Sequence, residues 1–161
     1  MTETDMGQLE IMNRYFDWFY DRVLDMPGIE DVQATRGGWR LSTRQWVKTY
    51  MMWAVSCGFL HVFGDNPDTP FAGILWRPIE SDKIDRYRLA YYDSLFEYDA
   101  DGDVAAVDYC YAPGHYPLII DFLKATGRKY TAWFHAKTGK LHLVPIAKMP
   151  KSFIFGTSFN D

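Results

Sequence analysis

Residues 104–134, VAAVDYCYAPGHYPLIIDFLKATGRKYTAWF, hold a strand, a helix and a second strand in direct succession. The apolar run at 104–111 predicts a buried strand. The stretch after it predicts a helix that tolerates Pro117 in its first turn and ends at Gly127. A helical crossover of this kind joins strands that run parallel. The chain therefore needs a sheet with at least one parallel pair.

Two predicted hairpins supply the other strands. The runs FLHVFG (59–64) and FAGILWRPI (71–79) flank a turn rich in Asn, Asp and Pro. The runs YTAWFHA and KLHLVPI flank KTGK, whose glycine suits a turn with positive φ. Hairpin strands are antiparallel, so together with the crossover they predict an α+β domain with a mixed central sheet flanked by helices.

Further helices are expected on either side of the first hairpin. Apolar residues recur at steps of three and four from Asp5 to Asp25, which predicts an amphipathic helix. Residues 28–41 read as an irregular connection, and the capping-box spacing of STRQ then opens a second helix that stops near Gly58. Residues 80–98 return to helical spacing.

The length of 161 residues fits a single domain, since domains commonly hold about 100–200 residues. We divide it into a helical part at 1–58, the sheet with its helices at 59–148, and a tail at 149–161. Aromatic residues make up 17% of the chain, which predicts a core built from Trp, Tyr and Phe and argues against disorder.

Charge and composition exclude several classes of partner. The net charge of −4 gives no overall attraction to nucleic acid, so none is expected as a partner. The N-terminus MTETDMGQLE lacks the features of a signal peptide, and no stretch reaches the roughly 18 apolar residues that a membrane span needs. The two cysteines, Cys57 and Cys110, fit reduced thiols. We therefore expect a soluble cytoplasmic protein.

The loop at 112–115 is the first candidate site. It leads from a strand into a helix whose first backbone N–H groups have no partner within the helix and favour an anion. A phosphate of coenzyme A or of a phosphopantetheine arm could bind there. Because the loop has a single glycine rather than the several of dedicated phosphate motifs, its pattern alone favours an ordinary strand-to-helix turn. The residues predicted to bind the cofactor are Tyr111, Ala112, Pro113, Gly114 and Tyr116.

Asp108 is the second candidate, because it interrupts an apolar strand. Strand alternation predicts that Asp108 shares a face with Ala106 and Cys110. A carboxylate in that position faces solvent, pairs with a donor in the core, or lies in a functional cleft. In a cleft it would orient or deprotonate a nucleophile.

Histidine and acidic residues give the remaining candidates for a catalytic or metal site. His115 is the best-placed imidazole, because it lies at the helix mouth whereas the other three histidines fall inside predicted strands. No ligand pair with metal spacing occurs, so no metal is expected. The string DADGD at 99–103 begins like a calcium loop, but its twelfth position is Cys110 where a bidentate glutamate is needed. We interpret it as a turn.

Three strings together resemble a known family. They are FLHVFGDNPDTPFAGILWRPI (59–79), the helical stretch that follows, and GDVAAVDYCYAPG (102–114) with the helix after it. This arrangement resembles the toxin-activating lysine acyltransferases, the haemolysin-activating family, over roughly residues 44–148. The resemblance implies a GNAT-like fold and transfer of a fatty acyl group from acyl carrier protein to lysine side chains of a toxin.

The resemblance also implies roles for single residues. Asp108 matches the catalytic aspartate of the family, and Trp76 matches the tryptophan of its second hairpin strand. The remaining matches are Gly102, Asp103, Tyr109, Ala112, Pro113 and Gly114. The catalytic histidine of the family follows its first helix, and this chain has no histidine before His61.

Two functional hypotheses follow. The first is a GNAT-like acyltransferase that moves an acyl group from acyl-CoA or acyl carrier protein to an amine, such as a protein lysine, with Asp108 as base or orienting acid and His115 as its partner. The alternative is a catalytically inactive protein of the same fold that serves as an interaction or assembly module, encoded by a phage or mobile element. A second copy of the chain is then a candidate partner. An open cleft at Asp108 favours catalysis. Exposed clusters among Trp18, Trp39, Trp46 and Trp53 favour binding.

Overall fold

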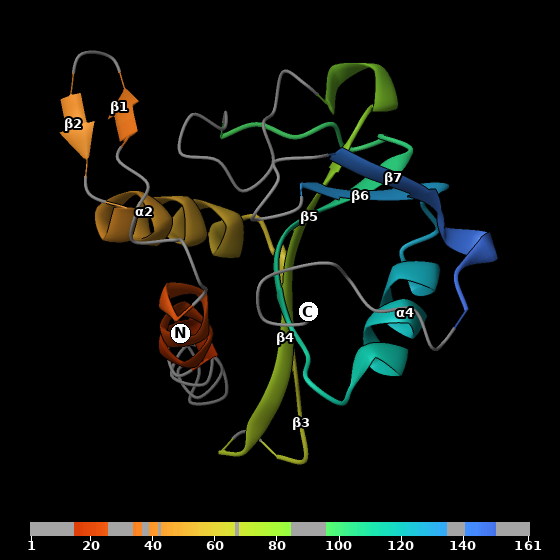
Figure 1. The fold of residues 1–161 in the computed structure, drawn as a ribbon, viewed down its shortest axis with the longest axis horizontal. Helices are drawn as coiled ribbons and strands as arrows, with labels where there is room; N and C mark the ends of the chain where they lie inside the picture. The colour runs from red at the N-terminus through yellow and green to blue at the C-terminus, as the bar shows by residue number, and fades with distance from the viewer. Residues whose placement is uncertain are drawn as a thin grey trace, which may run out of the picture.

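The computed structural model describes residues 15–25, 34–36, 39–41, 43–66, 68–84, 96–134 and 141–150. Its centre is a five-stranded sheet in the order β3–β4–β5–β6–β7 (Figure 1). The strands are β3 Leu60–Gly64, β4 Pro70–Ile79, β5 Val104–Tyr111, β6 Tyr130–Phe134 and β7 Leu141–Pro145. Strands β5 and β6 are parallel, and the other neighbouring pairs are antiparallel. The predicted α+β class and mixed sheet are therefore confirmed.

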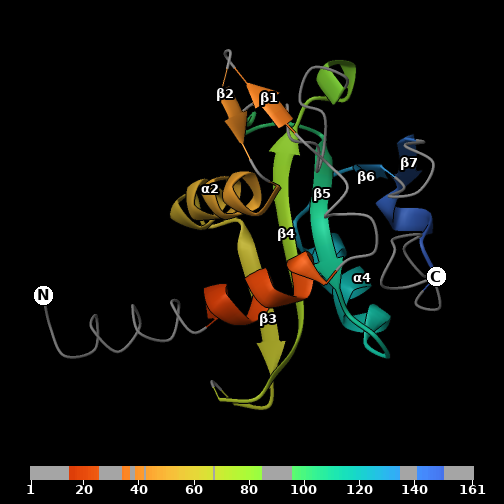
Figure 2. The ribbon, with the colours of Figure 1, turned by 60° about the vertical axis from the view of Figure 1, so that its left-hand side comes forward.

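Helices cover both faces of this sheet (Figure 2). A helix over residues 15–24 and α2, Thr43–Ser56, lie on one face, and α4, Tyr116–Ala125, lies on the other. Pro117 in the first turn of α4 and Gly127 at φ 71° beyond its end fit the predicted helix boundaries. No helix in the described ranges has the length and apolar character needed to cross a membrane.

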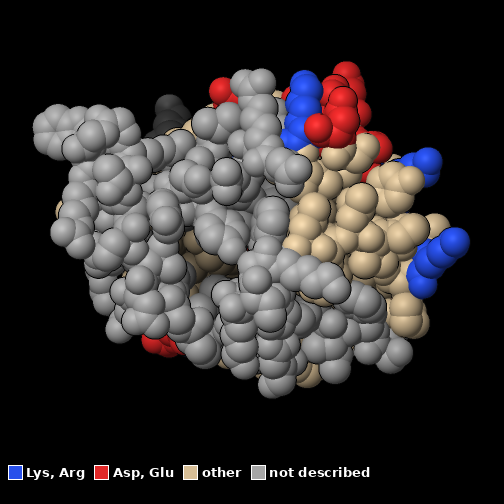
Figure 3. Space-filling view, turned by 45° about the horizontal axis from the view of Figure 1, so that its top comes forward, with Lys and Arg blue, Asp and Glu red and all other residues tan. Residues whose placement is uncertain are grey.

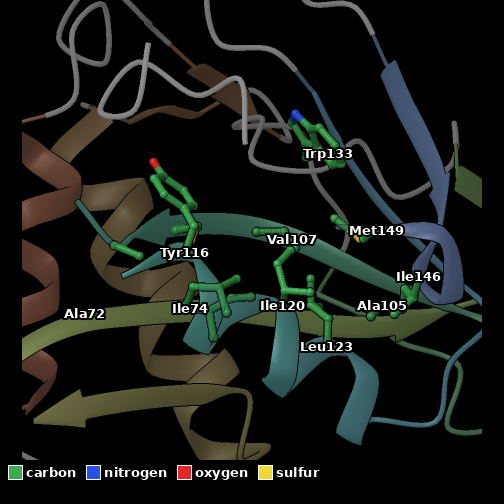
Figure 4. Close-up of a cluster of buried hydrophobic side chains, with 13 residues drawn as sticks. Ala72, Ile74, Ala105, Val107, Tyr116, Ile120, Leu123, Trp133, Ile146 and Met149 are labelled. Atoms are coloured by element: carbon green, nitrogen blue, oxygen red, sulfur yellow. The ribbon is translucent and has the colours of Figure 1, made fainter. Parts of the chain in front are cut away.

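The face under α4 is packed with apolar side chains (Figure 4). Ile120 and Leu123 of α4 lie against β4 and β5, and Trp133 and Met149 close the same cluster. Ile119, Ile120 and Leu123 are fully buried. This is the amphipathic packing that the crossover requires, with the apolar side of the helix on the sheet.

The opposite face is packed by aromatic and aliphatic side chains from the N-terminal helices. Phe19 and Val23 of the helix over residues 15–24 join Tyr50 of α2 against Leu75 of β4. The helix comes close to the sheet at Gly73, where an added Cβ would lie 3.0 Å from a ring carbon of Phe19. A side chain at this position would push the helix away from the sheet.

Two expectations from the sequence are corrected. Residues 28–41 were expected to be irregular, yet β1 Ala34–Arg36 and β2 Trp39–Leu41 pair as a two-stranded sheet. Strands of three residues carry too little periodicity to be seen in a sequence. The helix expected at 80–98 begins with a 3-10 turn at Ser81–Lys83, and residues 96–99 are not helical. Its centre, like residues 1–14 and the tail from 151, lies outside the described residues.

Candidate functional site

Strand β5 bulges at Asp108. Tyr109 pairs with Leu75 of β4, and Val107 pairs with the next residue, Trp76, so Asp108 is an extra residue without a Cα partner on that strand. The bulge shifts the alternation of side chains. Ala106 and Tyr109 pack with the cores on the side of the N-terminal helices, whereas Cys110 packs under α4.

The prediction that Ala106, Asp108 and Cys110 share one face is therefore wrong for Cys110. The reason is physical: one extra residue inverts the face of every residue that follows it in the strand.

The Asp108 carboxylate is held by side chains from two other elements. The Tyr50 hydroxyl on α2 donates a hydrogen bond to Oδ2, and Nη2 of Arg77 on β4 lies 3.7 Å from Oδ1. Neither Arg77 nor Asp108 has any exposed side-chain surface. Nη1 of Arg77 also donates to the carbonyl oxygen of Glu97 at 3.2 Å. The buried charge is thus paired and hydrogen-bonded, as a charge in a core must be.

The protonation of Tyr50 fits its role as a donor. Burial raises the pKa of the Tyr50 phenol well above its usual value, and the negative charge of Asp108 raises it further. The phenol therefore keeps its proton throughout the physiological pH range and donates it to the carboxylate. Burial raises the pKa of Tyr109 as well, so two neutral phenols, Tyr50 of α2 and Tyr109 of β5, lie beside one carboxylate.

Aromatic rings cover this network. The Tyr50 ring lies 5.6 Å from the Trp53 ring and 5.4 Å from the Phe96 ring, and the latter two are stacked. Phe59 extends the cluster from Trp53 to Trp76. Rings packed in this way exclude water, and pairing within the network is strengthened by the low local dielectric.

The loop before α4 presents a different surface. Pro113 and Gly114 are exposed, whereas Ala112 and Tyr116 are buried. Gly114 has φ 76°, and no atom lies within 4 Å of the position of a Cβ added there. A bound group could therefore approach the backbone closely at Gly114.

The helix mouth offers fewer donors than an open helix N-terminus. Pro117 has no N–H, and the N–H of Leu118 already donates to the carbonyl oxygen of His115 at 3.1 Å. The His115 N–H donates to Ala112 at 2.9 Å. The phosphate seat at residues 111–116 stays a prediction, and the N–H of His115 within it already has an acceptor in the chain.

The structure does not bring His115 together with Asp108. The His115 ring lies 4.2 Å from the ring of Phe71, which packs against the core under α4. Asp108 faces α2 on the opposite side of the sheet. The bulge keeps the carboxylate on that side, while the loop after Tyr111 turns toward α4.

Strands β5 and β6 separate where the bulge begins (Figure 1). The register of β5 with β6 covers Val104–Ala106 against Tyr130–Ala132 and goes no further in the described chain. Strand β6 continues to Phe134 and pairs with β7 along its whole length. Within the described residues, the strand register of 107–111 is therefore with β4, and the register with β6 does not extend to them. Neither the bulge nor this parting of the strands was predicted.

The described histidines of the predicted strands pack against aromatic rings. His61 of β3 stacks on Phe122 at 4.6 Å, and His142 of β7 stacks on Trp133 at 5.1 Å, as expected for histidines on the face of a sheet. His135 lies outside the described residues. Across the ranges that the structure describes, no group of three or more His, Cys, Asp or Glu residues is arranged to hold a metal ion.

The acidic residues at 99–103 accept hydrogen bonds from backbone N–H groups that follow β4. Asp99 accepts a hydrogen bond from the Glu80 N–H at 3.0 Å, and Asp103 accepts one from the Ser81 N–H at 2.9 Å. Lys83 lies within 3.5 Å of carboxylate oxygens of Glu80 and Asp99. On the face shown in Figure 3, acidic side chains gather at one corner, and a basic side chain lies directly beside them. The contacts agree with the interpretation of this string as a turn.

The tryptophans proposed as a binding surface are partly placed. Trp18 is half-buried between Phe19, Tyr111 and the guanidinium of Arg22, and Trp53 is half-buried in the aromatic cluster. The side chains of Trp39 and Trp46 lie outside the described residues. The two described tryptophans therefore serve the core rather than an exposed cluster.

Comparisons of the chain with protein-family models, with curated proteins and with solved structures find no match. The structure supports an α+β fold with a mixed five-stranded sheet. The likeness to the toxin-activating acyltransferases stays a prediction from the sequence.

Proposed function

We propose that this chain is a GNAT-like acyltransferase that takes an acyl group from acyl-CoA or acyl carrier protein and transfers it to an amine, such as a lysine side chain. One observation carries the proposal. Strand β5 bulges at Asp108 and parts from its parallel neighbour after Ala106, in the strand that leads into the loop at 112–115 and α4.

The parting of the strands suits an extended donor. In the described chain the register of β5 with β6 ends at Ala106, so an extended chain could lie beside residues 107–111 on that side. A pantetheine arm is an extended chain with two amides, and it can pair with a strand edge as an added peptide strand does.

The phosphate end of the same arm would then lie toward residues 112–116. Exposed Pro113 and Gly114 leave room for it. Because Pro117 and Leu118 supply no N–H to an outside anion, we expect the strand edge to carry more of the affinity than the helix mouth. Tyr111 and Ala112 would contact the arm between these two points.

The reaction itself is an aminolysis of a thioester. The amine attacks the thioester carbonyl, a C–N bond forms, the C–S bond breaks, and the proton of the amine ends on the departing thiol. We assign the first acceptance of that proton to His115, the partly exposed imidazole beside the loop. Asp108 is fully enclosed, so its role is to orient the strand rather than to take a proton from an amine.

One observation favours the alternative of a non-catalytic module. The side chain of Asp108, the residue that matches the catalytic aspartate of the family, has no exposed surface and is engaged by Arg77 and Tyr50. If the chemistry is lost, the same scaffold would serve in binding a protein partner, with a second copy of the chain as one candidate.

Thermal unfolding with and without donors tests the proposal. Acetyl-CoA, a long-chain acyl-CoA and acylated carrier protein are added to the purified protein, because a ligand of the folded state raises the midpoint with dose. Mass spectrometry of an added lysine peptide then reports acyl transfer. A rise with at least one donor supports the donor site, and peptide acylation supports the enzyme. No rise with any donor at saturation removes the proposal.

A further inference from the structure

We infer that Tyr50 and Arg77 are positioning residues that hold the Asp108 carboxylate and so fix the bulge of β5 at the place where it parts from β6. The bulge is observed in the register of β5 with β4. The consequence for donor binding rests on the proposed function.

The bulge needs an anchor outside the ladder. Asp108 has no Cα partner on β4, so pairing of the strands alone does not hold it in place. Its side chain supplies the anchor, since Tyr50 reaches it from α2 and Arg77 from β4. Arg77 extends the link to the backbone at Glu97 and lies with Cζ 5.5 Å from the centroid of the Tyr50 ring.

The two faces of the sheet differ in polarity at Asp108, so the contacts of Asp108 decide the register of β5. If β5 lost the bulge, its side chains would alternate strictly between the two faces of the sheet. The residues on one side of the bulge would then move to the opposite face. With Cys110 kept under α4, Asp108 would share that face, among Ile74, Ile120 and other apolar side chains. A carboxylate without partners in such a core is strongly disfavoured. Pairing by Tyr50 and Arg77 on the other face therefore selects the bulged register.

Register in turn controls the proposed donor edge. In the bulged strand, the ladder to β6 stops at Ala106. A regular strand would allow the ladder to continue toward Phe134, so that β6 would pair with the residues of β5 that directly follow Ala106. Weakening the network should therefore loosen these residues first and reduce donor binding with them.

Amide hydrogen exchange and donor binding on the full chain test this inference. The variants are Tyr50→Phe, which removes only the hydroxyl, and Arg77→Met, with Arg77→Lys as a second variant should Met prevent folding. Ile79→Val is the matched control, because Ile79 is fully buried on the same strand but pairs with Val104 at the far end of β5. Binding is measured by titration with acylated carrier protein.

The expected result is local. In Tyr50→Phe and in the Arg77 variant, amides at 107–111 exchange at least tenfold faster relative to amides of β6 and β7, and donor affinity falls at least tenfold. Ile79→Val changes exchange evenly and keeps donor affinity within twofold. If amides at 107–111 follow the rest of the sheet in the Tyr50 and Arg77 variants, the inference is overturned.

The two proposals fail separately. If the wild-type chain binds no donor, the proposed acyltransferase function is lost, while the exchange pattern still decides whether Tyr50 and Arg77 fix the bulge. If donor binding is retained in variants whose bulge exchanges fast, the positioning role in binding is lost and the donor site stands.

Discussion

The hydroxyl of Tyr50 donates a hydrogen bond to the carboxylate of Asp108, which lies 58 positions later in the chain. The bond joins α2 to the bulge of β5 beneath a cover of aromatic rings. It is a polar contact inside a core that is otherwise packed by apolar side chains. This hydrogen bond favours the bulged register of β5, because a regular strand would leave the Asp108 carboxylate without Tyr50 and Arg77.

Removal of the Tyr50 hydroxyl measures the strength of this contact. Tyr50→Phe is expected to lower the free energy of unfolding by about 1.5–3 kcal/mol, the usual range for a hydrogen bond to a charged group. Urea unfolding provides the measurement. Tyr98→Phe is the control, because Tyr98 is 44% exposed and should change stability by less than about 0.5 kcal/mol. Equal effects of the two substitutions would contradict the assignment.

Arg77 and Asp108 are expected to be energetically coupled. Arg77→Met leaves the buried carboxylate without its countercharge and should cost about 3–5 kcal/mol. Adding Asp108→Asn removes that charge, so the double variant should be more stable than Arg77→Met alone by at least about 1 kcal/mol. Denaturant unfolding of the four proteins of the cycle gives the coupling energy. A coupling energy near zero would show that the two side chains act independently.

Gly102 lies where the turn at 99–103 crosses the backbone of β4. A Cβ added there would fall 2.3 Å from the carbonyl carbon and oxygen of Ile79. Gly102→Ala should therefore destabilise by about 3 kcal/mol, since backbone must move to admit the methyl group. Gly127→Ala is a control with open space around the new Cβ and only the cost of positive φ, about 1–2 kcal/mol. The melting temperatures should follow this order, and the reverse order would refute the close approach.

The Cys110 thiol predicts a loss of stability at alkaline pH. Burial raises its pKa from about 9 to about 12. Between these values the folded chain keeps a proton that the unfolded chain has lost, so the free energy of unfolding falls as pH rises, by about 1.4 kcal/mol per pH unit for this group. Urea unfolding at several pH values should show a shallower fall in Cys110→Ala. An identical slope in both proteins would contradict the effect of burial on the thiol.

Most of the fold could be predicted because its signals are local. The apolar run at 104–111, the boundaries of α4 at Pro117 and Gly127, and the two hairpins each depend on neighbouring residues. The helix at 43–56 likewise follows from its spacing and its capping sequence.

The site could not be predicted to the same extent, because it depends on contacts between distant segments. Alternation alone gives no reason for Cys110 to leave the face of Ala106. The reason is the pairing of Asp108 with Tyr50 and Arg77, which no pattern within β5 reveals. The unusual residue itself was the available signal, since an acid in an apolar strand has to find a partner or a cleft.

The most direct test of the donor site compares two glycines at opposite ends of α4. Gly114 and Gly127 have φ 76° and 71°, and neither has an atom within 4 Å of an added Cβ, so a tryptophan strains the backbone at both. Only Gly114 lies at the proposed site. The measurement is a binding titration of acylated carrier protein against the wild type, Gly114→Trp and Gly127→Trp. We expect saturable binding by the wild type, affinity within twofold of it for Gly127→Trp, and at least a tenfold loss for Gly114→Trp. No saturable binding by the wild type, or equal losses in the two variants, would contradict a donor site at the mouth of α4.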